Sequence, residues 1–136
     1  MRPVLFDTNA YAAFKRNELA IVEIVQLAES IVISPIVIGE LLAGFDGGSK
    51  AQHNKRELQQ FLESSRITIC PITLDTSHFF SQIFCALKSK GKPIPTNDIW
   101  IASQALEHGC VVCTHDKHFS FIDGLISGSA VVDLFV

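Results

Sequence analysis

The sequence predicts an α/β fold: a three-layer α/β/α sandwich around a central, mostly parallel twisted sheet of four to five strands. Short apolar runs alternate along the chain with longer segments of helical period. The runs are continuous and rich in β-branched residues, which is typical of strands buried on both faces of a parallel sheet. Regular alternation of such strands with helices indicates a sheet covered by helices on both sides.

Length and composition limit the possible classes of protein. The chain has 136 residues, of which 48% are hydrophobic and 18% charged. These values are typical of a compact globule, and we expect one domain over residues 1–136. No apolar run reaches the roughly 18 residues of a membrane-spanning helix, and the apolar stretch at the start is too short for a secretory signal. We therefore expect a cytoplasmic protein that does not contact a membrane.

The apolar runs predict the positions of the strands. There are four such runs and a possible fifth, at residues 4–6, 31–33, 67–69, 110–113 and 130–132. Helices are expected between these runs. Ser34 and Pro35 form a favourable start, an N-cap followed by proline in the first turn. The last long helix is expected from about Asn97 to Glu107 and to end at Gly109.

Cysteine usage favours buried thiols over a metal site. Cys110 and Cys113 have the spacing of half a zinc site. They lie in an expected strand, however, where side chains three positions apart point to opposite faces. Cys70 and Cys85 are not spaced as the second half. We therefore expect ordinary buried thiols.

Four acidic residues are expected at one edge of the sheet. In an open parallel sheet, ligands bind beyond the carboxyl ends of the strands. Asp7 follows the first strand directly and Asp116 follows the fourth. Asp98 lies in the first turn of a helix, and Glu40 lies about one and a half turns into the helix that Ser34 begins. The long side chain of Glu40 can extend back toward the sheet edge.

Such a cluster of acids predicts a bound divalent cation. Carboxylates a few ångströms apart repel one another unless a positive charge lies between them. Mg²⁺ or Mn²⁺ prefers oxygen ligands of this kind, whereas zinc prefers His and Cys. Such ions can activate water for attack on a phosphodiester. The formal net charge of −3 does not argue against an RNA substrate. Apart from these four acids, the chain has ten Asp and Glu residues and eleven Lys and Arg residues, so the rest of it is slightly basic.

Each acid taken alone also has an ordinary structural interpretation. Asp7 could cap the next helix, Asp98 could be a first-turn acid favoured by the helix dipole, Glu40 could be an exposed helix residue, and Asp116 could belong to a turn. Asp75, in a similar context, is expected to be an N-cap. The interpretation as a site depends on the joint position of the four acids.

Other polar residues are candidates for supporting roles. Small polar side chains next to the acids could orient them or the attacking water, although capping and turn formation explain them too; these are Thr8, Asn9, Asn97 and Thr114. His115 and His118 flank Asp116, and we expect solvated loop histidines rather than a metal or acid role. Basic side chains that could contact RNA phosphates are Lys15, Arg16, Lys88, Lys90 and Lys92.

The residues around the four acids resemble the PIN domain family, and within it the VapC-like ribonuclease toxins of prokaryotic toxin–antitoxin pairs. The resemblance covers essentially the whole chain and rests on four segments, at residues 5–10, 34–41, 95–102 and 114–119. It implies a twisted parallel sheet, Mg²⁺ or Mn²⁺ in the acidic pocket, cleavage of single-stranded or structured RNA, a homodimer and a cognate antitoxin. Asp7, Glu40, Asp98 and Asp116 match the four acids of the family. Asn9, Asn97 and Thr114 match its supporting polar positions, while His115 departs from the smaller residue expected there.

Three alternatives use a similar arrangement of acids. A phosphoacceptor receiver domain requires paired acids after the first strand and an acceptor Asp after the third, where this chain has Cys70 and Pro71. A haloacid dehalogenase-like phosphatase requires a second Asp at the position of Asn9. A non-catalytic metal-binding or RNA-binding regulatory PIN domain keeps the fold without the chemistry and stays open at this point.

Overall fold

Five parallel strands form the central sheet of the computed structural model, which describes residues 2–135. The order in the sheet is β3-β2-β1-β4-β5, and the strands are β1 (Val4–Phe6), β2 (Ile31–Ile33), β3 (Ile67–Ile69), β4 (Val111–Cys113) and β5 (Ser127–Gly128). β1 lies at the centre, with Val4 level with Ile31 on one side and with Val111 on the other. The predicted fold class is confirmed.

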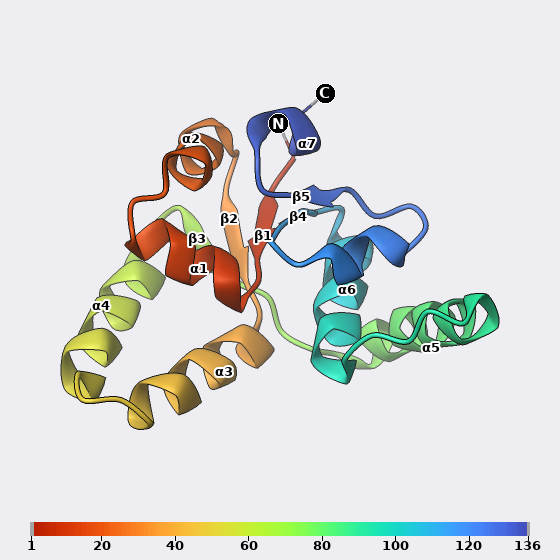
Figure 1. Cartoon of the computed structure of the whole chain (residues 1–136), viewed down its shortest axis with the longest axis horizontal. Coiled ribbons are helices and arrows are strands. Elements are labelled where there is room, and N and C mark those ends of the chain that lie inside the picture. The colour runs from red at the N-terminus through yellow and green to blue at the C-terminus, as the bar shows by residue number, and fades with distance from the viewer. Residues whose placement is uncertain (1, 136) are drawn as a thin grey trace.

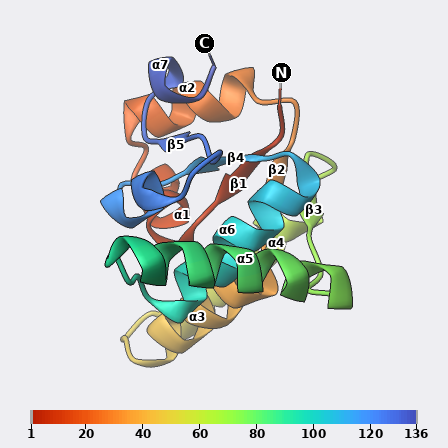
Figure 2. The same cartoon turned by 90° about the vertical axis from the view of Figure 1, so that its right-hand side faces the viewer.

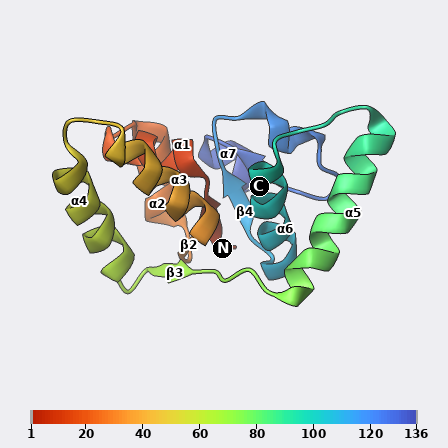
Figure 3. The same cartoon turned by 90° about the horizontal axis from the view of Figure 1, so that it is seen from below.

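Helices cover both faces of this sheet. One layer contains α1 (Thr8–Lys15), α2 (Leu19–Leu27), α3 (Pro35–Asp46) and α4 (Ala51–Glu63), and the other contains α5 (Leu74–Lys90) and α6 (Thr96–His108). Figures 1 and 3 show the two layers on either side of the strands. A short 3-10 helix, η1 (Lys117–Phe121), follows β4, and α7 (Val131–Leu134) follows β5. Within residues 2–135, no helix has both the length and the apolar character needed to traverse a bilayer.

Burial of the strands agrees with the continuous apolar runs except at the edge. All residues of β1, β2 and β4 are buried. In β3, by contrast, Thr68 and Ile69 are exposed, because β3 is an edge strand with a single neighbour. The expectation that every run is buried on both faces is therefore wrong for residues 67–69.

The expected fifth strand is also wrong in position. Ala130 precedes α7, which contains Val131 and Val132, and β5 is formed by Ser127 and Gly128. The carboxylate of Asp133 accepts hydrogen bonds from the backbone N–H groups of Ser129 and Ala130. Asp133, the third residue of α7, thus fixes the segment that leads into the helix and stabilises a helical turn over the β-branched pair.

The start of α5 corrects a further expectation. Asp75 lies within the first turn and is not the N-cap, which is Thr73. The backbone N–H of Thr73 donates to the hydroxyl of Thr76 at 3.0 Å. A first-turn acid still interacts favourably with the positive end of the helix dipole.

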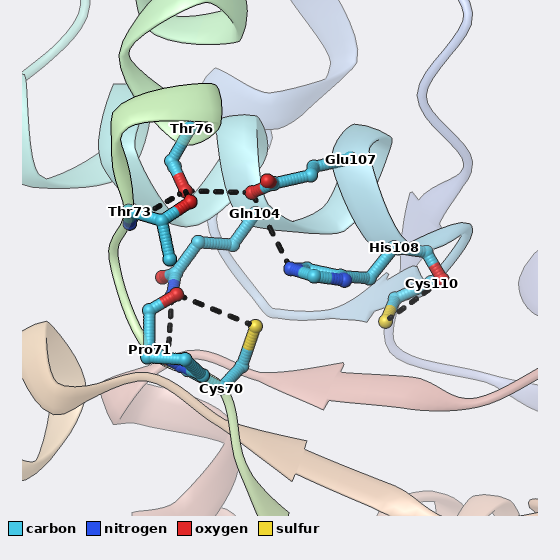
Figure 4. A network of polar contacts seen from close by, with 8 residues as sticks. All are labelled: Cys70, Pro71, Thr73, Thr76, Gln104, Glu107, His108 and Cys110. Carbon is cyan, nitrogen blue, oxygen red and sulfur yellow. Dashed lines mark hydrogen bonds and ion pairs between the residues drawn. The ribbon is translucent and has the colours of Figure 1, made fainter.

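A polar network anchors α6 to the segment between β3 and α5 (Figure 4). The buried Gln104 amide donates to the carbonyl oxygens of Cys70 at 2.7 Å and Pro71 at 3.3 Å. On the next turn of α6, Glu107 accepts from the Thr76 hydroxyl at 2.6 Å. Because buried, satisfied polar groups resist displacement, this network fixes the position of α6, whose first turn contains Asp98.

The topology creates a crevice at the carboxyl edge of the sheet. From β1 the chain passes through α1 and α2 to β2 on one side, while β4 pairs with β1 on the other side. Ligands bind at such a switch point in open parallel sheets. α7 and the amino end of β1 lie at the opposite edge of the sheet (Figures 1 and 2).

Candidate active site

Asp7 leaves β1 at the carboxyl edge and is buried, with 4% of its surface exposed. One carboxylate oxygen, Oδ1, accepts the backbone N–H of Ala10 at 2.9 Å and so caps α1. The other oxygen, Oδ2, accepts a hydrogen bond from the hydroxyl of Thr114, directly after β4. Both interpretations of Asp7 from the sequence therefore hold: it caps a helix and it lies in the crevice.

Burial makes a negative charge at this position unfavourable. The pKa of Asp7 is raised from 3.8 to about 6, chiefly by burial and also by the charges of Asp98 and Asp116, against the opposing effect of the hydrogen bonds from Thr114 and Ala10. Burial also raises the pKa of Asp98, against the hydrogen bond with His118. A cation among these carboxylates would offset both effects, since an opposite charge within a few ångströms favours the ionised form.

Glu40 is held by polar side chains from two other helices. The Ser34 hydroxyl accepts the N–H of Ile36 at 3.1 Å and begins α3. Further along α3, the carboxylate of Glu40 accepts from the Thr8 hydroxyl at 2.7 Å and from the Asn97 amide at 3.2 Å. Glu40 is exposed, so these two bonds fix a side chain that would otherwise move freely in solvent.

Asp98 and Asp116 meet on the other side of the crevice. The backbone N–H of Asp116 donates to the Thr114 hydroxyl at 2.8 Å, so that Thr114 connects Asp7 to Asp116. His118 Nδ1 lies 3.0 Å from Asp116 Oδ1 and 3.3 Å from Asp98 Oδ2. The loop histidine predicted to be solvated therefore contacts two of the four acids.

All four acids line one cavity of about 290 Å³, which we call the acidic cavity. Its other lining residues are Thr8, Asn9, Ala12 and Ile101. Asn97 and Thr114 contact acids of the cavity through the hydrogen bonds described above. The structure thus brings together the four acids and the four supporting polar residues that the sequence suggested.

His115 and His118 behave differently. The ring of His115 pairs with Glu18 at 2.8 Å, and its backbone N–H donates to Asn9 Oδ1. His118 turns toward the acids because Asp116 is the N-cap of η1, with its carboxylate accepting the His118 N–H at 2.9 Å, and because Phe119 is fully buried. No pattern in the sequence signals this contact.

Four of the five basic residues expected to contact RNA have partners in the structure. Lys15 pairs with Glu57 at 3.2 Å, Arg16 with Glu18 at 3.7 Å, and Lys90 with Asp123 at 2.6 Å. Lys92 lies over the ring of Phe121. Lys15 and Arg16 line a second cavity of about 250 Å³ that shares Ala12 with the acidic cavity. These two are thus placed beside the acidic cavity, whereas Lys88 and Lys90 lie in the last turn of α5.

Comparison with known proteins identifies the family of this arrangement. The family model described as PIN domain matches residues 4–125. The chain belongs to the PIN domain family. This PIN domain is 32% identical over 127 residues to ribonuclease VapC2 of Rickettsia felis, covering 90% of the chain and 93% of the relative. It is 29% identical to ribonuclease VapC1 of Haemophilus influenzae strain R2866, covering 89% and 92%. Within the PIN domain family, the chain therefore groups with the VapC proteins, as the sequence predicted.

Solved structures agree with this assignment. The PIN domain matches a chain of the Rickettsia felis VapBC2 structure, bound to a promoter DNA fragment, with a TM-score of 0.81 and 27% identity, covering 92% and 96% of the two chains. A chain of DNA-bound VapBC from Salmonella typhimurium gives the same score and identity, with coverage of 93% and 97%. The sheet order and the helical layers are thus those of known VapBC proteins.

Proposed function

We propose that this chain is a metal-dependent endoribonuclease that acts as the toxin of a type II toxin–antitoxin pair. One observation carries the proposal: four carboxylates from four separate parts of the chain line a single cavity at the switch point of the sheet. The donor set fits Mg²⁺ or Mn²⁺, because it consists of carboxylate oxygens in a pocket that disfavours uncompensated negative charge.

In this proposal, Asp7, Glu40, Asp98 and Asp116 hold the cation. Bound there, it would activate water for in-line attack on a phosphodiester and stabilise charge on the leaving oxygen. Thr114 fixes the orientation of Asp7, while Thr8 and Asn97 fix Glu40. Such partners of ligand side chains set the direction in which each oxygen points. The burial of Asp7 keeps one side of the cavity free of bulk water.

RNA is the proposed substrate, approaching across the surface beside α1. The cavity lined by Lys15 and Arg16 shares a wall with the acidic cavity. Their ion pairs are exposed, and exposed pairs of this kind contribute at most about 1 kcal/mol. Phosphates can therefore replace Glu57 and Glu18 as partners of these two side chains at low cost. We expect Lys88, Lys90 and Lys92 to contribute less.

A protein partner is part of the same proposal. Two of the similar solved structures contain VapBC on DNA, and we propose that this chain likewise binds a cognate antitoxin and forms a homodimer. We also propose the cytoplasm as its compartment. Cys70, Cys110 and Cys113 are buried free thiols, which suits a reducing environment.

Cleavage of a mixed RNA pool tests the activity. Wild-type protein is expected to cut RNA with Mg²⁺ or Mn²⁺ and not with EDTA. Asp7→Asn and Asp98→Asn should each lower cleavage by at least about a hundredfold, because each removes a proposed cation ligand. Asp46→Asn, the same change at an exposed residue paired with Lys55, should cut like wild type. Equal cleavage by all four proteins would reject the proposal, because the acids would then not be needed; no cleavage by the wild type would favour a non-catalytic PIN domain.

Growth of a bacterium that lacks the antitoxin tests the toxin role. Expression of the wild-type chain should stop growth, whereas expression of Asp7→Asn should not. Growth arrest by both proteins at equal expression would show that the arrest does not depend on the acidic cavity.

A further inference from the structure

The ring nitrogen Nδ1 of His118 faces two acids of the cavity, Asp98 and Asp116, at distances typical of atoms that bind the same cation. The three atoms Asp98 Oδ2, Asp116 Oδ1 and His118 Nδ1 lie within 4.8 Å of one another. Nδ1 is 3.3 Å from the first oxygen and 3.0 Å from the second. Neighbouring ligand atoms around an octahedral divalent cation are about 3 Å apart, since each lies about 2.1 Å from the ion.

A single hydrogen bond accounts for one of these two contacts but not for both, because Nδ1 carries at most one hydrogen atom. Charge-assisted hydrogen bonds between nitrogen and a carboxylate are typically about 2.7–2.9 Å long, and Nδ1 of His118 faces two oxygens from two different residues at longer distances. A cation between the three atoms would use all of them as ligands at once.

The turn that follows Asp116 holds the ring in this place. Asp116 caps η1 through the N–H of His118, and the neighbouring Phe119 is fully buried. The side chain of His118 is 43% exposed, compared with 18% for Asp98. An ion can therefore reach the ring nitrogen from solvent without unfolding η1.

We propose that His118 is a nitrogen ligand of the cation site and makes that site selective for first-row transition cations over Mg²⁺. The inference rests on the proposed function, because it deepens the description of the same cation site. Mg²⁺ keeps oxygen ligands and water and gains little from an imidazole. Transition cations bind imidazole well, and their affinity for mixed nitrogen and oxygen sites rises from Mn²⁺ to Cu²⁺. The all-oxygen donor set expected from the sequence is thus extended by one nitrogen.

Binding of Mn²⁺ and Mg²⁺ to the purified full chain tests the selectivity. Mn²⁺ binding is measured by electron paramagnetic resonance of the free ion, and Mg²⁺ binding by competition against Mn²⁺. His118→Leu should weaken Mn²⁺ binding by about tenfold or more, as expected on losing a ligand, and change Mg²⁺ binding by less than about threefold. His115→Leu, the matched change at the neighbouring histidine, should leave both affinities unchanged.

A spectroscopic measurement separates ligation from an indirect effect on folding. Pulsed electron paramagnetic resonance of bound Mn²⁺ should show coupling to a ¹⁴N nucleus in wild type and His115→Leu, and no such coupling in His118→Leu. Thermal unfolding of the three metal-free proteins checks that each is folded. Bound Mn²⁺ without ¹⁴N coupling in the wild type, or equal Mn²⁺ affinity in wild type and His118→Leu, would overturn the role of His118.

Failure of this inference differs from failure of the proposed function. If Asp98→Asn loses Mn²⁺ and RNA cleavage while wild type shows no nitrogen coupling, the nuclease proposal stands and His118 is not a ligand. If wild type shows nitrogen coupling but does not cut RNA, His118 is a ligand and the nuclease proposal fails. If the wild type binds neither cation, both are rejected.

Discussion

Asp7 combines two roles whose electrostatic requirements conflict. As the cap of α1, its carboxylate accepts a backbone N–H. As a lining residue of the acidic cavity, it lies close enough to Asp98 and Asp116 for their charges to repel its own. Its ionised form is favoured by the first role and disfavoured by the second and by burial. The raised pKa of about 6 shows that burial and repulsion outweigh the cap and the Thr114 hydrogen bond.

This conflict predicts how stability depends on pH in EDTA. The pKa of Asp7 rises from 3.8 to about 6 on folding, so between these values the folded chain binds the proton more tightly than the unfolded chain. Stability is therefore lost as pH rises from about 4 to about 6. At pH 7, Asp7→Asn should be more stable than wild type by roughly 1–3 kcal/mol, and at pH 4 the difference should largely vanish.

Urea unfolding of the metal-free proteins at the two pH values measures this difference. Asp46→Asn provides the control, because Asp46 is exposed and its replacement should have a small effect at both. A stability difference between wild type and Asp7→Asn that is the same at pH 4 and pH 7 would contradict the argument.

The bonds to Glu40 predict a separate effect on activity. Thr8→Val keeps the shape of the side chain and removes the 2.7 Å bond to Glu40; Asn97→Ala removes the other bond. Each should lower RNA cleavage by about tenfold, because a proposed ligand then samples more orientations. Thr68→Val, the same change on the exposed edge strand, should leave the cleavage rate unchanged. Full activity in Thr8→Val would show that Glu40 does not need this partner.

Among the elements, the first four strands could be predicted and the last one could not. Residues 4–6, 31–33, 67–69 and 111–113 are strands, as their apolar runs predicted. β5, by contrast, consists of Ser127 and Gly128, which have no apolar pattern, and it exists because it pairs with β4. Val131 and Val132 favour a strand locally, but capping by Asp133 makes them helical. Tertiary contacts override local propensity at both places.

The contact between β5 and α7 predicts a strong effect at Gly128. A Cβ atom there would lie 2.6 Å from Asp133 Oδ2 and closer still to Asp133 Cβ. Asp133 cannot move without losing its bonds to Ser129 and Ala130. Gly128→Ala should therefore destabilise the chain by roughly 1–3 kcal/mol in urea unfolding.

Gly44 provides the matched comparison. In α3, a Cβ at this position would meet nothing within 4 Å, so Gly44→Ala should be neutral or stabilising by up to about 1 kcal/mol. Similar unfolding midpoints for the two alanine variants would show that α7 moves away at no cost.

The candidate site was predictable where it follows from sheet topology. Asp7 and Asp116 leave neighbouring parallel strands at the same edge, which the order of strands and helices already implies. The contact of His118 with the acids depends on one 3-10 turn, and the pairing of Lys90 with Asp123 joins residues 33 positions apart. Neither contact produces a periodic pattern in the sequence, so neither could be predicted from it.

For the molecule as a whole, the acidic cavity connects the two helical layers with the central strand of the sheet. Glu40 comes from the layer of α1–α4, Asp98 from α6 in the opposite layer, and Asp7 from the central strand. A cation bound to all three would therefore bind the folded state and not the unfolded chain. Such binding stabilises the fold in proportion to the logarithm of cation concentration.

Thermal unfolding with added Mn²⁺ checks this coupling. At a concentration about a hundred times the dissociation constant, wild type should gain about 2.7 kcal/mol, which corresponds to several degrees in Tm. Asp98→Asn should gain much less at the same concentration. An equal rise in Tm for the two proteins would indicate that the ion binds elsewhere on the chain.

The position of α7 and of the amino end of β1, across the sheet from the acids, has a practical consequence for anyone handling the protein. A surface, dye or second domain attached beside either of these two elements projects away from the mouth of the crevice. Immobilised or fluorescently labelled preparations should accordingly process polynucleotides at the same rate as untagged material. Coupling through the solvent-facing thiol of Cys85 on α5 offers an alternative attachment point without engineering.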